Sequence, residues 1–257
     1  MTTTTPTRGL DTRALVPFVA VALPVGWVLL SIPLVADLPI EPFVLATLLL
    51  GLVAPALLLT RRDPATSIRA LLHECWRVPR PLVLLPALLV IPVTTWAVAG
   101  PNGSDVDGGV IAGLTFNIVS SVLIVNVWEE MAWAGFVQRR AALRWGVIGG
   151  AVATAAMFTG IHLPLAFYGA DDTSDVLVNV AAMVVAGIGM RFLIAAFDQW
   201  GRGSILVLGV LHASFNATGN FLHDDVDWVR YVVTLGLGAA AVTIPSVRKP
   251  VPEELSR

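Results

Sequence analysis

Continuous apolar stretches, each close to the length of a bilayer crossing, recur along the whole chain. A helix that rises about 1.5 Å per residue needs roughly 20 residues to cross about 30 Å of hydrocarbon. The stretches occupy residues 15–36, 41–60, 81–100, 109–136, 147–168, 176–197, 204–222 and 228–245. The spans of a β-barrel would instead be segments of about ten residues with alternating polarity. The sequence therefore predicts an all-α polytopic membrane helix bundle of about eight transmembrane helices.

The composition agrees with a membrane protein, because 56% of the residues are hydrophobic and only 13% are charged. Soluble domains carry about 25% charged residues. Since few residues lie outside the apolar stretches, we expect one integral membrane domain over residues 1–257, with its polar motifs in a core of about 109–222. We expect the first stretch to be a retained span, because it lacks a clear signal-peptide cleavage site. The single Cys75 excludes an intrachain disulfide and fits no metal-ligand spacing.

Charged residues divide between the two ends of the predicted spans. Basic residues fall on one side: Arg8, Arg13, Arg61, Arg62, Arg69, Arg77, Arg80, Arg139, Arg140, Arg144, Arg202, Arg248, Lys249 and Arg257. Acidic residues gather on the other side, where Arg230 is the only basic residue: Asp37, Glu41, Asp105, Asp107, Asp171, Asp172, Asp175, Asp224, Asp225 and Asp227. The positive-inside rule predicts a multi-pass protein with both termini in the cytoplasm. Fifteen arginines against one lysine suggest a GC-rich bacterial genome, and hence the bacterial inner (cell) membrane.

The basic segment 60–80 contains Pro64, and we interpret it as a cytoplasmic loop in preference to a helix lying on the anionic leaflet. The chain has no nucleic-acid motif, and its basic clusters are accounted for by membrane orientation. We therefore expect lipid and a peptide or membrane-protein substrate as partners, and no nucleic acid. The sequence indicates no particular oligomeric state.

A few ionisable and amide side chains lie deep inside the apolar stretches: Glu129, Glu130, His162, His212 and Asn216. Helix geometry places the glutamates and His212 about 15 Å from the basic side. Such groups are costly in lipid and usually mark function. Taken singly, His162 or Asn216 could be interhelical hydrogen-bond partners, and the glutamates could pair with an arginine of another helix. Their common depth favours one shared site instead.

These residues form three ordered motifs. A glutamate pair is followed by two pairs of residues four apart: Glu129-Glu130, Phe158 with His162, and His212 with Asn216. The order and the intervals resemble the CAAX protease and bacteriocin-processing family of intramembrane endopeptidases, which includes the type II CAAX prenyl endopeptidases. The resemblance covers about residues 117–219.

The resemblance implies that Glu129 and His162 position and deprotonate a water molecule, while His212 and Asn216 stabilise the tetrahedral oxyanion. Neighbours on a helix point about 100° apart, so one glutamate can act on a substrate while the other organises its neighbour. The resemblance assigns this second role to Glu130. We favour this metal-independent form, with no cofactor. A zinc site formed by Glu129, His162 and His212 is the alternative, although the chain has no HExxH signature. The site is expected to open toward the cytoplasm.

One position departs from the family pattern, which has an arginine four residues after the second glutamate. This chain has Ala134 there. Arg191, at a comparable depth in the stretch 176–197, could supply the missing charge to Glu130, or it could extend to the membrane interface.

Prenylated proteins are not expected substrates in a bacterium. Membrane-associated peptides, bacteriocin precursors and membrane-protein tails fit better. Two other classes of function are considered. The absence of the motif arginine leaves a non-catalytic scaffold or bacteriocin-immunity partner open. A transporter is a weaker alternative, because the two halves of the chain share no repeat.

Overall fold

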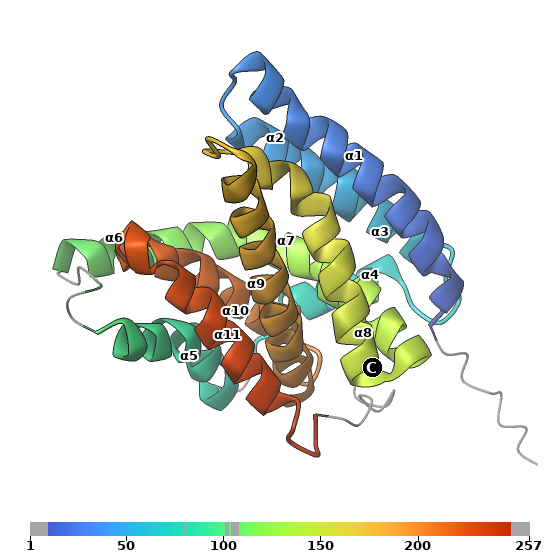
Figure 1. The fold of residues 1–257 in the computed structure, drawn as a ribbon. Helices are drawn as coiled ribbons and strands as arrows, with labels where there is room; N and C mark the ends of the chain where they lie inside the picture. The colour runs from blue at the N-terminus through green and yellow to red at the C-terminus, as the bar shows by residue number, and fades with distance from the viewer. Residues whose placement is uncertain (1–9, 80, 101–102, 104–107, 248–257) are drawn as a thin grey trace, which may run out of the picture.

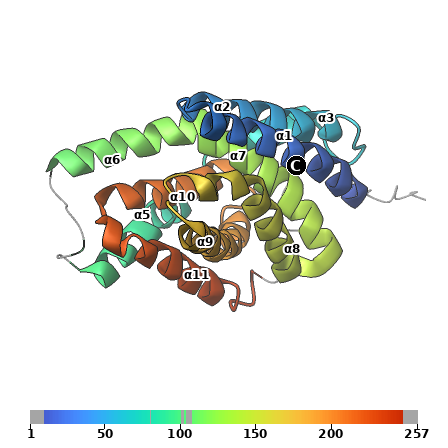
Figure 2. The same ribbon diagram turned by 45° about the horizontal axis from the view of Figure 1, so that its top comes forward.

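The computed structural model describes residues 10–79, 81–100, 103 and 108–247. Every regular element in these residues is a helix, and the helices form a bundle (Figures 1 and 2). The predicted all-α membrane bundle is confirmed, since five helical segments are long and apolar enough to cross a membrane. Some charged residues used to orient the chain lie outside the described residues: Arg8, Arg80, Asp105, Asp107, Arg248, Lys249 and Arg257.

The first two predicted spans form a helical hairpin. A 3-10 turn, Thr12–Ala14 (η1), leads into α1, Leu15–Ala36. The return span is a continuous run made of α2, Glu41–Ala46, a π-helical segment, Thr47–Val53 (η2), and α3, Ala54–Thr60. The two spans lie side by side along one edge of the bundle (Figure 1). Their ends agree with the predicted boundaries.

The segment after the second span contains a short helix, so the interpretation of 60–80 as a loop is wrong. Helix α4, Ile68–Cys75, begins at Ser67, whose hydroxyl accepts a hydrogen bond from the Ala70 amide. Leu71 and Cys75 are buried against the bundle. Burial raises the pKa of the Cys75 thiol to about 12, as expected of an unreactive cysteine.

The central part of the chain is helical from residue 108 to residue 167. After α5, Pro81–Ala99, it runs through α6, Gly108–Ser121, a π segment, Val122–Asn126 (η4), and α7, Val127–Glu130. A second π segment, Met131–Gln138 (η5), leads into α8, Arg139–His162, and the 3-10 helix Leu163–Phe167 (η6). This run provides the fourth and fifth predicted spans.

The chain reverses within α8 at Gly146. Its φ of 73° belongs to the left-handed region, which glycine adopts without strain. Beyond this turn, a Cβ on Gly150 would lie only 2.5 Å from the Ala142 backbone nitrogen, so the two arms pack closely. The reversal separates the arm that carries Glu129 from the arm that carries His162.

The last three helices complete the bundle. They are α9, Thr173–Trp200, α10, Ile205–Thr218, and α11, Trp228–Ala241. Short 3-10 turns, Gly219–Phe221 (η7) and Asp224–Val226 (η8), lie between α10 and α11. Helices α10 and α11 are shorter than the predicted spans 204–222 and 228–245.

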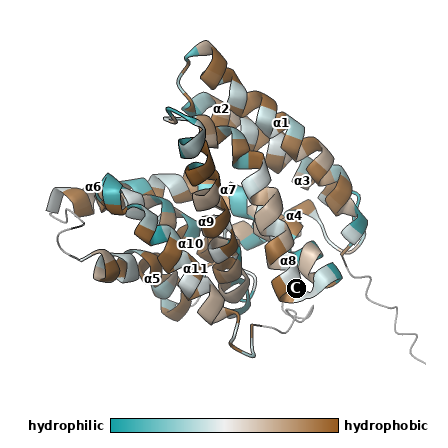
Figure 3. Cartoon of the chain, viewed as in Figure 1, coloured by the Kyte–Doolittle hydropathy of each residue, from teal (hydrophilic) through white to brown (hydrophobic). Residues whose placement is uncertain are grey.

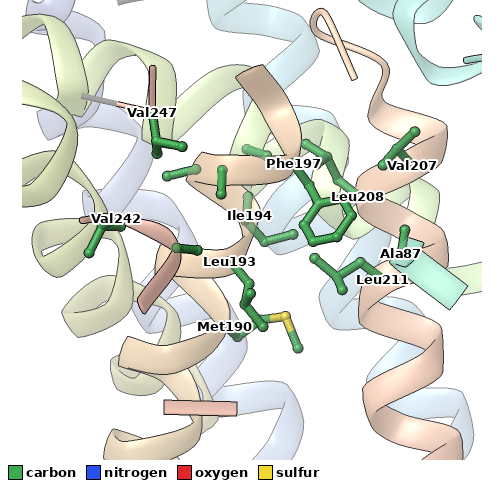
Figure 4. Close-up of a cluster of buried hydrophobic side chains, with 14 of the residues drawn as sticks. Ala87, Met190, Leu193, Ile194, Phe197, Val207, Leu208, Leu211, Val242 and Val247 are labelled. Carbon is green, nitrogen blue, oxygen red and sulfur yellow. The ribbon is translucent and has the colours of Figure 1, made fainter. Parts of the chain in front are cut away.

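A buried hydrophobic cluster fixes α9 against α10 (Figure 4). Met190 and Leu193 of α9 and Leu208 and Leu211 of α10 belong to it. Arg191 follows Met190 and His212 follows Leu211, so the same packing sets the positions of both polar residues. Hydrophobic residues also dominate the outer helices, where many large side chains are exposed, as expected for a surface in contact with lipid (Figure 3).

Candidate active site

The two glutamates occupy a single α-helical turn between two π-helical segments. Helix α7 contains only Val127, Trp128, Glu129 and Glu130. Glu130 is completely buried, whereas the Glu129 side chain keeps 10% of its surface exposed. π-Helical distortions frequently mark functional sites, because they change the direction in which neighbouring side chains point. Here the two π-helical segments flank the turn that places the Glu129 carboxylate at the wall of a cavity and the Glu130 carboxylate inside the protein.

Glu130 forms a fully buried, bidentate ion pair with Arg191 of α9. Arg191 Nη1 lies 2.8 Å from Glu130 Oε2, and Arg191 Nη2 lies 2.6 Å from Glu130 Oε1. Neither side chain is exposed, so the alternative in which Arg191 extends to the interface is wrong. The guanidinium also lies 4.7 Å from the Phe158 ring centroid, and Gln138 binds the Arg191 carbonyl oxygen.

His212 of α10 lies beside both glutamates. Its Nδ1 is 2.7 Å from Glu130 Oε1 and 3.8 Å from Glu129 Oε2. An ionised carboxylate can only accept, so the short contact requires a proton on Nδ1. Nε2 is therefore the ring nitrogen of His212 that remains for a substrate.

His162 lies at the end of α8, where its Nδ1 is 2.7 Å from the Phe158 carbonyl oxygen. A carbonyl oxygen accepts, so Nδ1 carries a proton and neutral His162 has its lone pair on Nε2. This Nε2 lies 3.7 Å from Glu129 Oε1, which is too long for a direct hydrogen bond. The Phe158 ring packs between the two histidines, with centroid distances of 4.5 Å to His162 and 5.9 Å to His212.

Four of the five candidate residues line a cavity of about 510 Å³. Glu129, His162, His212 and Asn216 all line it, as does Phe158. Asn216 is exposed on α10, one turn beyond His212. Glu130 does not line the cavity and instead holds His212 and Arg191 behind it. Glu129 therefore faces the cavity, whereas Glu130 lies behind it.

The cavity wall extends from these groups to residues close to the acidic loops. Its wall includes Leu30 near the end of α1, Tyr168 after η6 and Asn179 near the start of α9. It also includes Arg230, the one basic residue that the charge pattern placed on the acidic side. The sequence marked Arg230 as unusual but did not connect it with the site.

Ion-pair clusters occupy the basic end of the bundle. Arg139 binds Glu74 of α4 at 2.5 Å and Asp198 of α9 at 2.8 Å. Arg140 binds Asp63 at 2.6 Å, with both side chains 2% exposed. None of these residues lines the cavity. The side chains nearest the basic loops therefore bind one another and do not extend the site in that direction.

The zinc alternative needs three ligands around one point. Among the described residues, no group of three His, Cys, Asp or Glu side chains has an arrangement suited to hold a metal ion. Glu129, His162 and His212 are all described, and both histidines direct Nδ1 to protein oxygen atoms, which leaves Nε2 as the nitrogen that could bind a metal.

Residues 111–218 match the family model described as type II CAAX prenyl endopeptidase Rce1-like. The matched segment contains all five candidate site residues and Arg191, which confirms the resemblance recognised from the three motifs. No curated protein matches the chain.

Proposed function

We propose that this chain, whose segment 111–218 is similar to Rce1-like type II CAAX prenyl endopeptidases, is an intramembrane endopeptidase that hydrolyses membrane-associated peptides or proteins. The observation that carries the proposal is the convergence of Glu129, His162, His212 and Asn216 on one cavity within a membrane bundle. Peptide hydrolysis needs a base for water and donors for an oxyanion, and this set contains candidates for both.

The first step is activation of water between Glu129 and His162. Glu129 Oε1 and His162 Nε2 are 3.7 Å apart, a separation at which one water molecule can donate a hydrogen bond to each. Removal of a proton from this water produces the nucleophile that attacks the scissile carbonyl carbon. The same proton then passes to the leaving amine nitrogen as the C–N bond breaks.

The second step is stabilisation of the oxyanion by α10. His212 and Asn216 are one turn apart on the same face and both line the cavity. The Asn216 amide group donates directly. His212 can donate from Nε2 when both ring nitrogens carry protons, with Nδ1–H bound to Glu130. Donors held in place within a site of low dielectric act most strongly where the charge develops.

Glu130 and Arg191 form the support for this arrangement. Arg191 donates hydrogen bonds to both carboxylate oxygens of Glu130, and Glu130 Oε1 also accepts one from His212 Nδ1. The carboxylate is thereby kept in one orientation, which fixes the imidazole ring. In this account Arg191 performs from α9 the role that the family pattern assigns to an arginine at position 134.

The proposed setting is a bacterial cell membrane, with both termini on the cytoplasmic side. Since the cavity extends toward the acidic loops, we place substrate entry on the face opposite the basic segments. The substrates are then hydrophobic peptides or tails of membrane proteins that reach the site from the non-cytoplasmic side. The scheme needs no metal ion.

A non-catalytic scaffold or immunity partner is the second candidate function, because Ala134 interrupts the first motif. Proteomics of membrane fractions from cells with the intact chain or Glu129→Gln separates the two. The endopeptidase predicts uncut precursors that accumulate only with Glu129→Gln. Identical sets of peptide termini, together with a phenotype that survives the substitution, would support the scaffold.

A further inference from the structure

The cavity wall carries a positive group that the proposed chemistry does not use. Arg230 lies near the start of α11 and lines the same cavity as Glu129 and His162. It is partly buried, and no hydrogen bond joins it to the residues that activate water. A cation on the wall of an otherwise largely apolar cavity selects for an anionic group on whatever fills that cavity.

The guanidinium is held in position by its neighbours on α11 and in the preceding turn. Arg230 Nε lies 2.8 Å from Asp227 Oδ1, and Nη2 lies 2.9 Å from Asp227 Oδ2. Nη2 also lies 3.0 Å from the Tyr231 hydroxyl oxygen, which donates to Asp227. The rings of Phe215 and Tyr231 pack against the guanidinium at 5.2 and 4.9 Å. These contacts fix the plane of the group before any ligand binds.

One edge of the guanidinium keeps its capacity to donate. Nη1 lies 3.4 Å from the Phe215 carbonyl oxygen, at the long limit of a hydrogen bond. The backbone leaves room for this edge, because a Cβ on Gly219 would lie 2.6 Å from Nη1. Any side chain at position 219 would therefore displace the guanidinium or its neighbours.

A second polar group on the cavity wall, the Tyr168 hydroxyl, has no hydrogen-bond partner among the described residues. This hydroxyl is buried, and Tyr168 lines the cavity. Buried polar groups are nearly always hydrogen-bonded in native proteins, so an unpaired one indicates a position for a ligand or water. The cavity wall thus includes two residues with donor groups, the Arg230 guanidinium and the Tyr168 hydroxyl.

We infer that Arg230 forms a subsite for a carboxylate of the peptide substrate. This inference rests on the proposed function, since it assigns the class of peptide that the site accepts. The carboxylate is either the C-terminus of the peptide or an Asp or Glu side chain, and both present the same two oxygen atoms. Asp227 orients Arg230 and balances part of its charge, so the subsite favours a carboxylate without binding it permanently.

The test measures peptide binding by the full-length Glu129→Gln protein in lipid nanodiscs, so that no peptide is cleaved. Two pools of random hydrophobic decapeptides serve as probes, one with free C-terminal carboxylates and one with amides. Each position includes Glu and Gln at equal frequency. Retained peptides are identified by mass spectrometry, with Arg230 intact, as Arg230→Gln and as Arg230→Lys. Arg202→Gln, an exposed site outside the cavity, is the control.

With Arg230 intact, we expect the pool with free C-terminal carboxylates to be retained about tenfold or more strongly than the amide pool. This difference corresponds to one charge-assisted hydrogen bond. Arg230→Gln should abolish the preference, Arg230→Lys should keep part of it and Arg202→Gln should leave it unchanged. Enrichment of Glu over Gln in both pools would assign the carboxylate to a side chain. Equal retention of the two pools without Glu enrichment, or the same preference in Arg230→Gln, overturns the inference.

The outcome is separable from that of the proposed function, because binding and cleavage are measured on different proteins. Cleavage by the wild-type chain without a carboxylate preference rejects only the subsite. Carboxylate-selective binding by a chain that cleaves nothing rejects the endopeptidase and leaves the subsite standing.

Discussion

Arg191 and Glu130 meet through two hydrogen bonds, of 2.8 and 2.6 Å, in a part of the bundle where neither side chain has any exposed surface. Ala134, where the family pattern has its arginine, is itself buried in the cluster that contains Met190 and Ile194 of α9. The cation that balances Glu130 therefore comes from another helix, α9.

Arg191→Ala should destabilise the protein strongly, because removal of one partner leaves an uncompensated buried charge, at a cost of about 3–5 kcal/mol. Adding Ala134→Arg to Arg191→Ala should restore part of the thermal stability and activity, since it returns a cation to the position that the family uses. Thermal unfolding in detergent, followed by a peptide cleavage assay, measures both. A double variant no more stable than Arg191→Ala would contradict the equivalence of the two positions.

Stability at low pH should depend on Asp63, outside the membrane spans. Burial alone would raise the pKa of this carboxyl, but hydrogen bonds from the Ala65 and Asp11 amides and from Arg140 lower it. A lowered folded-state pKa gives stability that is complete above the unfolded value, about 3.9, and is lost as the pH falls through the folded value.

Asp63→Asn should therefore lower the melting temperature near neutral pH by about 5–10 °C, since it leaves Arg140 buried without its carboxylate. The difference from wild type should shrink as the pH falls below about 4. Asp171→Asn, at an exposed site on the opposite side, is the matched control. A difference that stays constant from pH 7 to pH 3 would refute this role for Asp63.

The side from which substrate enters can be tested with single cysteines in a Cys75→Ala background. Ala182→Cys lines the cavity, and Ala65→Cys is exposed near the basic loops. In intact spheroplasts, a membrane-impermeant thiol reagent should label Ala182→Cys but not Ala65→Cys, because the cavity extends toward the acidic side. Inside-out vesicles should give the reverse pattern. Labelling of Ala182→Cys only in inside-out vesicles would restore the cytoplasmic opening predicted from the sequence.

Chelation should leave the activity intact, because the proposed steps use a carboxylate, two imidazoles and an amide. Purified protein is incubated with a strong zinc chelator, dialysed and assayed for peptide cleavage alongside metal analysis. Activity that is lost on chelation and returns with added zinc would replace the water-activation scheme by one based on zinc bound to Glu129, His162 and His212.

Much of the fold follows from the sequence, because apolar length alone defines helix positions in a bilayer. The ends of the first two spans agree with the prediction to the residue. The π segments Val122–Asn126 and Met131–Gln138 were not predicted, since hydrophobic periodicity does not distinguish a π turn within an apolar helix. A helix in the basic segment 60–80 was the less favoured interpretation, because the short apolar face of α4, around Leu71 and Cys75, lies among basic residues.

The candidate site, like the fold, could be predicted from the sequence only in part. Spacing in the sequence identified the motif residues, and depth correctly suggested Arg191 as a partner of Glu130. The direction in which the cavity opens stays a prediction, because the distance of Glu129 from Arg139 says nothing about which end of the bundle is filled by ion pairs. The place of Arg230 in the wall depends on how α11 packs beside α10, and no local pattern encodes this.

The most direct test of the proposed function compares the purified wild-type chain with Glu129→Gln in the same nanodiscs, using a pool of membrane-derived peptides and mass spectrometry of new termini. Both proteins should melt at similar temperatures, because Glu129 makes no short hydrogen bond to another residue in the described structure. We predict that the wild-type chain cleaves peptides and that Glu129→Gln slows cleavage by about 100-fold or more. Cleavage at an undiminished rate by Glu129→Gln would contradict the account.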